Sequence, residues 1–321
     1  MRTRSLSIVV PVFNEEDNVA PLFWKIKEVL EEVAFEVIFV DDASTDSTLS
    51  LLVQLNSRFP KEARYISFAR NFGHQTAIRA GLLCVRGDCA VTMDGDFQHP
   101  PELIPHMLRL WREGYEIVNA RRKHPRDIGY FKKITSTLFY KMNNTLTEFK
   151  LEEGVADFRL MDRKIVEHVN GLSEDNLFLR GIVAWLGFRQ CCVDYEQPGR
   201  MFGASKYTLK KMFGLALSGV TSFSVKPLRL ALAFGCVFSA LSFLYGFYAI
   251  AIYFKGQSLP GWASVLVSGL FIGGIQLICL GIMGEYVAKI HMQVKNRPLF
   301  VVKARSCERS DCVGGADGKT D

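Results

Sequence analysis

Four apolar runs alternate with amphipathic segments over the first hundred residues of the chain. The four runs are residues 7–12, 35–40, 64–68 and 89–93, each read as a strand. The first is continuous, as expected for a strand buried on both faces of a sheet. Between the runs, aliphatic residues recur at three- and four-residue spacing, which predicts helices: about 22–33, 48–55 and 75–85. Strands alternating with helices predict an α/β fold with a doubly wound, mostly parallel sheet.

Every predicted strand ends in polar residues. The pairs Asn14 and Glu15, Asp41 and Asp42, Arg70 and Asn71, and Asp94 and Asp96 follow the four strands in order. Because the carboxyl ends of parallel strands meet at one edge of the sheet, where open α/β sheets bind ligands, these clusters predict one site.

The most informative segment is 91–101, where an apolar strand stops at two carboxylates one residue apart, Asp94 and Asp96. Two hard oxygen ligands in a tight turn suit Mg²⁺ or Mn²⁺ on a diphosphate. The alternative is an ordinary Asp-Gly turn after a strand. The chain has neither a G-x-G-x-x-G after its first strand nor a G-x-x-x-x-G-K-[ST] loop, so we expect phosphates to be held through a metal.

Two runs near the C-terminus, 230–254 and 262–284, contain no charged residue and are long enough to span a bilayer. The short turn 255–261 between them predicts a transmembrane hairpin, and two buried core helices are the alternative. Lysines and arginines lie before the first run and after the second, so the positive-inside rule places the N-terminal domain and the tail in the cytoplasm.

The predicted organisation is a cytoplasmic transferase domain over 1–206, an interfacial helix over 207–228, two membrane helices within 229–288 and a cytoplasmic tail over 289–321 that ends in disorder. A basic amphipathic stretch at 130–142 is either a second interfacial helix or a core-facing one. The formal net charge of +6 fits an anionic ligand or membrane surface, and no dense basic tract indicates nucleic acid.

Several motifs together resemble inverting family 2 glycosyltransferases of the type A fold, and among them the polyprenyl-phosphate glycosyltransferases, which include bactoprenol glucosyltransferases and dolichol-phosphate mannose synthases. The resemblance rests on segments 10–15, 40–46, 70–73, 94–98 and 200–207, followed by two C-terminal spans. One departure is Ala43, where this family commonly has glycine after the paired aspartates.

The resemblance implies roles for individual residues. Contacts to the nucleotide sugar are implied for Pro11, Asn14, Glu15, Asp42, Asn71, Asp94 and Gln98. Binding of Mg²⁺ or Mn²⁺ is implied for Asp94, Asp96 and Gln98. Contacts to phosphates or to the lipid acceptor are implied for Arg122, Arg200, Ser205 and Lys206.

Asp157 matches the position proposed as catalytic base in that family, and Asp96 is the second catalytic candidate. A phosphate monoester is largely a dianion at neutral pH and needs no general base. Asp157 would then orient Arg159, the metal or the acceptor, or serve as a structural ion-paired residue. His74 and His99 are interpreted as polar residues at the rim of the site, and neither is assigned as a metal ligand.

By analogy, the expected reaction is inverting transfer of glucose from UDP-glucose to undecaprenyl phosphate at a bacterial inner membrane. We also expect a homo-oligomer, and the family resemblance suggests a tetramer. A processive polysaccharide synthase is disfavoured because the sequence lacks a Gln-x-x-Arg-Trp motif. A non-catalytic membrane scaffold with a decayed transferase domain is the other alternative.

Overall fold

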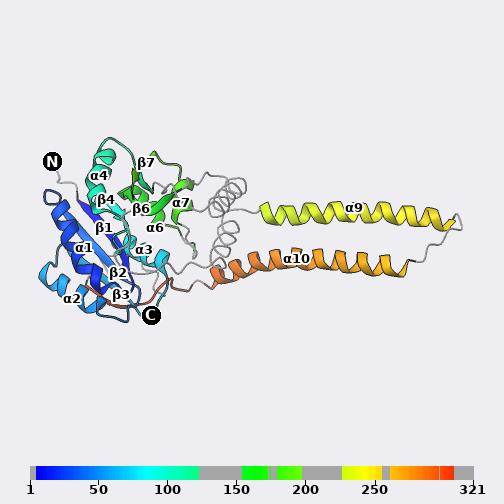
Figure 1. Cartoon of the computed structure of the whole chain (residues 1–321), viewed down its shortest axis with the longest axis horizontal. Coiled ribbons are helices and arrows are strands. Elements are labelled where there is room, and N and C mark those ends of the chain that lie inside the picture. Colours follow the sequence, from blue (N-terminus) through cyan, green and yellow to red (C-terminus); the bar gives the residue numbers. More distant parts are fainter. Residues whose placement is uncertain are drawn as a thin grey trace. The chain divides into compact units, whose positions relative to one another are not determined.

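The computed structural model describes residues 5–122, 154–172, 174, 179–196, 226–254, 261–295 and 297–306. Of these, residues 5–122, 154–172, 174, 179–196 and 297–306 belong to one compact unit, and the two long C-terminal helices belong to another. Figure 1 shows the elements of both units in sequence colours. Each unit is described by itself.

The first unit is built on an eight-stranded sheet with the order β7-β5-β6-β4-β1-β2-β3-β8. Its strands are β1 (Leu6–Val12), β2 (Phe35–Asp41), β3 (Ala63–Phe68), β4 (Cys89–Thr92), β5 (Ile117–Arg122), β6 (Val155–Asp162), β7 (Gln190–Tyr195) and β8 (Val302–Arg305). Strand β6 runs antiparallel to β4 and β5, and β8 runs antiparallel to β3, whereas the other pairs are parallel. The prediction of a mostly parallel α/β sheet is confirmed.

Helices cover both faces of this sheet. They are α1 (Glu16–Val29), α2 (Thr48–Arg58), α3 (His74–Leu83), η1 (Pro101–Leu103), α4 (Ile104–Arg112), α6 (Arg163–Asn170) and α7 (Leu179–Trp185). Alternate residues of β1 point to opposite faces, as the pleat requires: Ile8 and Val10 join the core with α1, and Val9 meets α3. A Cβ at Gly81 would overlap the Val9 side chain, so glycine lets α3 lie close to the sheet.

The four predicted strands are those found, within one or two residues at each end. Strands β5 to β8 were not predicted. The segment 289–321, expected to be a tail, instead begins with the last turns of a helix and then adds β8 to the sheet. The remaining residues of that expected tail, 307–321, lie outside the described residues, as do the two expected interfacial stretches except for residues 226–228.

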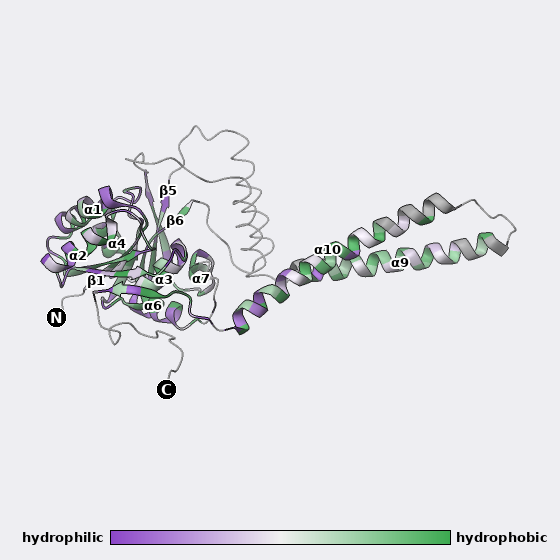
Figure 2. Ribbon diagram, turned by 90° about the horizontal axis from the view of Figure 1, so that it is seen from below, coloured by the Kyte–Doolittle hydropathy of each residue, from purple (hydrophilic) through white to green (hydrophobic). Residues whose placement is uncertain are grey.

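The second unit consists of α9 (Lys226–Phe254) and α10 (Trp262–Val294). They run side by side as a hairpin in which the rings of Phe238 and Phe271 meet at 5.7 Å. Apolar residues lie along both helices (Figure 2), and large side chains are exposed, for example Leu232 at 69% and Leu277 at 70%.

Both helices are long and apolar enough to cross a membrane by length and composition. The apolar window of the second, Phe271–Val294, extends beyond the predicted end at residue 284. Neither window is buried, so these are not the core helices of this chain.

Candidate active site

Three loops at the carboxyl ends of β1, β2 and β4 hold a non-glycine residue in the left-handed region. These residues are Asn14, Ala43 and Phe97, with φ of 56°, 62° and 60°. Such conformations are costly for L-residues and tend to gather at functional sites. The predicted site edge therefore carries three backbone positions that the surrounding contacts must enforce.

The loops after β1 and β2 are joined by hydrogen bonds. The Asn14 N–H donates to Ser44 Oγ at 2.9 Å, and Asn14 Oδ1 accepts from the Thr45 N–H at 2.8 Å. The Glu15 N–H donates to Thr48 Oγ1 at 2.9 Å, and the Glu15 carboxylate accepts from Asn18. Pro11 lies within β1 beside Val40. The structure thus brings the predicted residues 11, 14 and 15 to this edge, and their nucleotide contacts stay predictions.

Asp42 is 4% exposed and organises the next loop. Its two carboxylate oxygens accept from the N–H groups of Phe72 at 2.6 Å and Gly73 at 2.9 Å. Burial raises the pKa of Asp42, although these two hydrogen bonds oppose the rise. Asp42 therefore fixes the loop that exposes Asn71, so that both predicted nucleotide-binding residues lie at one place.

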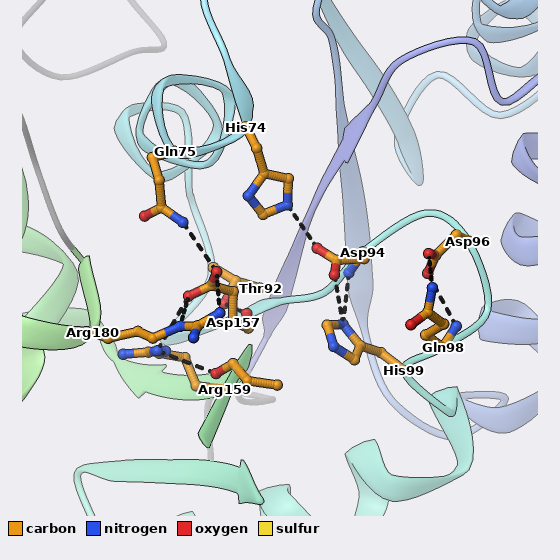
Figure 3. A network of polar contacts seen from close by, with 11 residues as sticks. His74, Gln75, Thr92, Asp94, Asp96, Gln98, His99, Asp157, Arg159 and Arg180 are labelled. Atoms are coloured by element: carbon orange, nitrogen blue, oxygen red, sulfur yellow. Dashed lines mark hydrogen bonds and ion pairs between the residues drawn. The ribbon is translucent and has the colours of Figure 1, made fainter. Parts of the chain in front are cut away.

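Asp94 lies just beyond the end of β4, between two histidines (Figure 3). His74, the first residue of α3, contacts Asp94 Oδ1 through Nε2 at 2.7 Å. The Asp94 N–H donates to His99 Nδ1 at 2.9 Å, so this nitrogen of His99 carries no proton. His99 is 4% exposed and stacks on Phe158 at 5.0 Å, so its interpretation as a rim residue is wrong.

The two histidines differ in charge preference. Burial opposes a charge on His74, but the hydrogen bond to Asp94 and the negative charges of Asp94 and Asp157 outweigh it and raise the pKa of His74. Burial lowers the pKa of His99 despite the nearby carboxylates. Burial also opposes the charge on Asp94, but the hydrogen bond from His74 and the two imidazoles keep the pKa of Asp94 below its usual range.

Asp96, two residues on, holds the tip of the same loop. Its carboxylate accepts from the Gln98 N–H at 3.1 Å and from the Gln98 side-chain amide. The side-chain nitrogen of Gln98 thus donates to Asp96. The role of Gln98 as a metal ligand stays a prediction.

The donor set at this edge fits Mg²⁺ or Mn²⁺. Asp94 and Asp96 supply hard carboxylate oxygens, and the Asp94 side chain is one-third exposed. Within the described ranges, no group of three or more His, Cys, Asp or Glu side chains forms a closed metal site. One or two carboxylates, completed by substrate phosphates and water, are the usual protein contribution to a magnesium site.

Asp157 lies on β6 at the centre of a second polar cluster (Figure 3). Arg180 from α7 donates Nε to Oδ1 at 2.9 Å and Nη2 to Oδ2 at 3.0 Å, and Gln75 donates Nε2 to Oδ2 at 3.0 Å. Burial disfavours its charge, but the Arg180 and Arg159 guanidinium groups overcome this and hold the pKa of Asp157 far below its usual range. Asp157 is 6% exposed and is held as an anion.

The first turn of α3 connects the two clusters, because His74 contacts Asp94 and the next residue, Gln75, contacts Asp157. A second link runs through β4, where Thr92 Oγ1 donates to the Asp157 carbonyl at 2.6 Å. Displacing Asp157 would therefore disturb the loop that carries the paired aspartates.

Arg159 is fully buried two residues from Asp157 on the same face of β6. It contacts Asp157 Oδ1 at 3.5 Å and the Ala156 carbonyl at 3.2 Å, and its Nε has no hydrogen-bond partner. Burial lowers the pKa of Arg159 to about 10, although Asp157 opposes the shift. Arg159 lies behind the exposed Arg180 and is closed off from solvent.

Of the four predicted phosphate or acceptor contacts, only Arg122 lies within the described residues; Arg200, Ser205 and Lys206 lie outside them. Arg122 ends β5 and is exposed beside Tyr195 of β7. Its neighbour Arg121 is paired with Asp194 at 2.6 Å. Arg122 is therefore the better placed of the two arginines to meet a phosphate.

The sequence did not identify Gln75 and Arg180 as partners of Asp157, and it placed His99 at the rim of the site. Nothing in the local pattern marks Arg180, which reaches Asp157 from 23 positions away. His99 had a signal: it stands five residues after Asp94 in a short turn, where an imidazole can accept a backbone N–H.

Comparison with known proteins gives two family matches. The family described as "Glycosyl transferase family 2" matches residues 7–169, and the "GtrB C-terminal hairpin" matches residues 226–290. The first covers the strands and loops that carry Asp42, Asp94 and Asp157, and the second covers most of α9 and α10.

Among similar proteins, an uncharacterized glycosyltransferase of Bacillus subtilis is 41% identical over 92% of this chain and 93% of its own length. A bactoprenol glucosyl transferase derived from the SfII prophage of Shigella flexneri is 41% identical over 93% of this chain and 97% of its own. Among solved structures, glucosyl-3-phosphoglycerate synthase from Mycobacterium tuberculosis, in complex with Mn²⁺, uridine-diphosphate and phosphoglyceric acid, gives a TM-score of 0.48 at 16% identity, covering 68% of this chain and 76% of that one. A likeness at that level supports no inference about the site.

Proposed function

This chain belongs to glycosyl transferase family 2, and from that premise we propose that it transfers a sugar from a nucleoside-diphosphate sugar to a polyprenyl phosphate. The donor we propose is UDP-glucose and the acceptor undecaprenyl phosphate. The observation that carries the proposal is the Asp94 and Asp96 pair at the site edge of a chain that also has an apolar two-helix hairpin. The first feature suits a water-soluble diphosphate donor, and the second suits a lipid acceptor.

At the donor side, we propose that the diphosphate lies over the turn that holds Asp94 and Asp96. When bound there, Mg²⁺ or Mn²⁺ would neutralise charge that develops on the departing nucleoside diphosphate. The nucleoside would extend toward Asn14 and the loop exposing Asn71, which Asp42 fixes. His99 supports this arrangement by holding the Asp94 backbone.

At the acceptor side, a phosphate oxygen attacks the anomeric carbon, its bond to that carbon forms, and the bond from the carbon to the diphosphate oxygen breaks. A single in-line displacement inverts the anomeric configuration. The acceptor is largely ionised at neutral pH, because the second pKa of a phosphate monoester is near 6. The attack therefore needs cationic groups around the phosphate, and Arg122, Arg200 and Lys206 are the proposed ones.

The geometry of Asp157 favours a positioning role over a basic one. Its carboxylate already accepts three hydrogen bonds from Arg180 and Gln75 and remains ionised far below neutral pH. So weak a base is a poor proton acceptor. We propose that Asp157 holds Arg180 at the site and keeps the first turn of α3 in place.

The hairpin explains how the two substrates meet. A polyprenyl tail cannot leave the bilayer, and a nucleotide sugar stays in water, so the reaction must take place at the headgroup plane. We propose that the hairpin spans the membrane and that the catalytic domain is cytoplasmic. The support is that basic residues precede the first helix of the hairpin and follow the second. Cysteine labelling of the 255–261 turn from the periplasmic side of intact cells tests this orientation.

We also propose a homo-oligomer, by the resemblance given above. A Cβ built at Gly269, Gly273 or Gly281 would meet nothing within 4 Å, so these faces of α10 are open in the single chain. Light scattering in mild detergent tests the proposal, and a monomer would contradict it.

The experiment that tests the function presents a panel of radiolabelled nucleotide sugars to the full chain with undecaprenyl phosphate and Mn²⁺. A labelled lipid product from one donor, with free nucleoside diphosphate, supports the proposal and names the sugar. A product that lengthens with time would favour a processive synthase. Failure to bind any nucleotide in the presence of Mn²⁺ would favour the scaffold.

A further inference from the structure

The segment that follows the membrane hairpin lies against the loop that exposes Asn71. Residues 297–306, here called the C-terminal arm, follow α10 in the sequence but belong to the same compact unit as the sheet. Strand β8 of this arm pairs antiparallel with β3, the strand that leads into the Asn71 loop. Figure 1 shows the arm, in orange to red, passing beside β3.

Hydrogen bonds hold the arm against β3 from Tyr65 to the end of the strand. At its far end, Ser306 exchanges hydrogen bonds with Tyr65: the Ser306 N–H donates to the Tyr65 carbonyl at 3.0 Å, and the Tyr65 N–H donates to Ser306 Oγ at 2.8 Å. At its near end, the Ala69 N–H donates to the Val301 carbonyl at 2.9 Å, beyond the last residue of β3. The arm therefore fixes the first residue of the loop as well as the strand.

Aromatic contacts extend this support into the loop. The ring of Phe300 stacks on that of Phe68 at 5.0 Å with an interplanar angle of 24°. Phe68, fully buried, meets Phe72 edge-on at 5.6 Å, and the guanidinium of Arg70 lies 4.1 Å from the centre of the Phe72 ring. A continuous row of four side chains thus runs from the arm to the loop on either side of Asn71.

The other side of the loop is held by groups already assigned to the site. Asp42 accepts from the N–H groups of Phe72 and Gly73, and Gly73 has a φ of 97°, a value that favours glycine. The next residue is His74, which contacts Asp94. The loop therefore has two supports, Asp42 from the sheet and Phe300 from the arm, and it connects directly to the paired aspartates.

The arm also closes an edge of the sheet. Lys303 and Arg305 point outward from β8 and are exposed, whereas Val302 and Ala304 are half-buried, the pattern of a strand protected against further pairing. In the absence of the arm, β3 would be the edge strand and Phe68 would lose one of its two aromatic neighbours.

We infer that the C-terminal arm is part of the nucleotide-sugar site, with Phe300 as a positioning residue that holds the Arg70–Gly73 loop in its donor-binding conformation. The inference rests on the proposed function for the identity of the donor. Its consequence is that the catalytic domain is made of two separate stretches of chain, and that donor binding depends on residues that come after the membrane helices.

The test uses the full chain in detergent and measures UDP binding in the presence of Mn²⁺, followed by KM and kcat for UDP-glucose. Phe300→Ala is expected to weaken UDP binding and to raise KM for the donor by about three- to tenfold, the effect of losing one aromatic pair. The value of kcat at saturating donor and the KM for the lipid acceptor should change less than twofold. Phe300→Tyr keeps the stacked ring and should restore donor binding.

Phe59→Ala is the matched control for general loss of stability. Phe59 is also a half-buried phenylalanine among aromatic neighbours, Phe23 and Trp24, but it lies before β3, at the end of the strand away from the loop. This variant should leave UDP binding unchanged.

The outcomes separate the inference from the proposed function. If the unaltered chain binds UDP and Phe300→Ala binds it equally well, the inference is wrong and the proposed function stands. Equal weakening by Phe59→Ala would also overturn the inference. If the unaltered chain neither binds UDP nor any other nucleotide of a panel, the proposed function fails first.

Discussion

The guanidinium group of Arg180 holds the carboxylate of Asp157 through two parallel hydrogen bonds, at 2.9 and 3.0 Å. This bidentate pairing is among the stronger side-chain interactions in proteins and fixes the geometry of both groups. Asp157 is buried, whereas the Arg180 side chain is 38% exposed. The pair therefore presents a cation at the surface of the site and keeps its counter-ion behind it.

The pH dependence of transfer should show no ionisation of Asp157. Its pKa is lower in the folded chain than in the unfolded one, so the stability that its charge provides is fully present above the ordinary carboxyl pKa and is lost only as the pH falls below that value. Between about pH 6 and 9, Asp157→Asn should reduce kcat without changing the shape of the rate profile. If the pH–rate profile of the unaltered enzyme falls at low pH and that of Asp157→Asn does not, Asp157 acts as a general base and the positioning role is wrong.

The same pair should show strong coupling in a double-mutant cycle of unfolding free energy. Asp157→Asn or Arg180→Met alone removes the ion pair between the two side chains, and we expect each to cost about 2–4 kcal/mol. The double variant should be less destabilised than the sum by at least about 1 kcal/mol. The exposed pair of Lys25 and Glu28 is the control, and its cycle should show no measurable coupling. Additive losses at Asp157 and Arg180 would show that the pairing is incidental.

Substitutions of His99 should distinguish the contribution of its ring stacking from that of its hydrogen bond with the Asp94 N–H. Phenylalanine preserves the ring that stacks on Phe158 but cannot accept the Asp94 N–H, so His99→Phe should destabilise the domain by about 1–3 kcal/mol and weaken Mn²⁺ binding. His99→Asn keeps an acceptor near the same place and should bind Mn²⁺ more tightly than His99→Phe. Urea unfolding and Mn²⁺ titration measure the two effects. Full stability of His99→Phe would mean that the hydrogen bond does not hold the loop.

Ala43 offers a test of the strained edge. At φ of 62°, alanine lies in a region that costs an L-residue about 1–2 kcal/mol, whereas glycine enters it freely but loses more entropy on folding. Ala43→Gly should therefore be neutral or more stable by up to about 1 kcal/mol. Ala20→Gly, inside α1, should lose about 1 kcal/mol in the same denaturation experiment. Equal losses at both positions would contradict the assigned conformation.

The sequence predicted the half of the sheet whose strands are mainly apolar. Strands β1 to β4 read as short, mainly apolar runs, and their ends at Asn14, Asp41 and Asp94 stand out because carboxylates and amides are poor strand residues. For this reason the predicted site edge and the paired aspartates agree with the structure.

The other half of the sheet could not be read in the same way. Strand β6 contains Asp157 and Arg159 on either side of Phe158, so its apolar run is interrupted at its centre. Strand β8 is short and contains two charged residues. Its place in the sheet follows from pairing with β3, more than 200 residues away in the sequence, which no local pattern encodes.

The partners of the predicted residues were equally hidden. Arg180 reaches Asp157 from α7, and Gln75 reaches it from the first turn of α3, which Gly81 allows to lie close to the sheet. Both contacts depend on tertiary packing. The sequence could therefore predict which strand ends carry the candidate residues but not which side chains hold them.

We propose that Asp94 and Asp96 bind the metal that a nucleotide-sugar donor requires. The most direct measurement is the rate of glucose transfer from UDP-glucose to undecaprenyl phosphate as a function of Mn²⁺ concentration, for the full chain, Asp96→Asn and the exposed-carboxylate control Asp17→Asn. We expect the rate to depend saturably on Mn²⁺ for the unaltered chain and for Asp17→Asn, and to fall by at least about 100-fold for Asp96→Asn. Transfer that persists without a divalent metal, or that survives in Asp96→Asn, would contradict it.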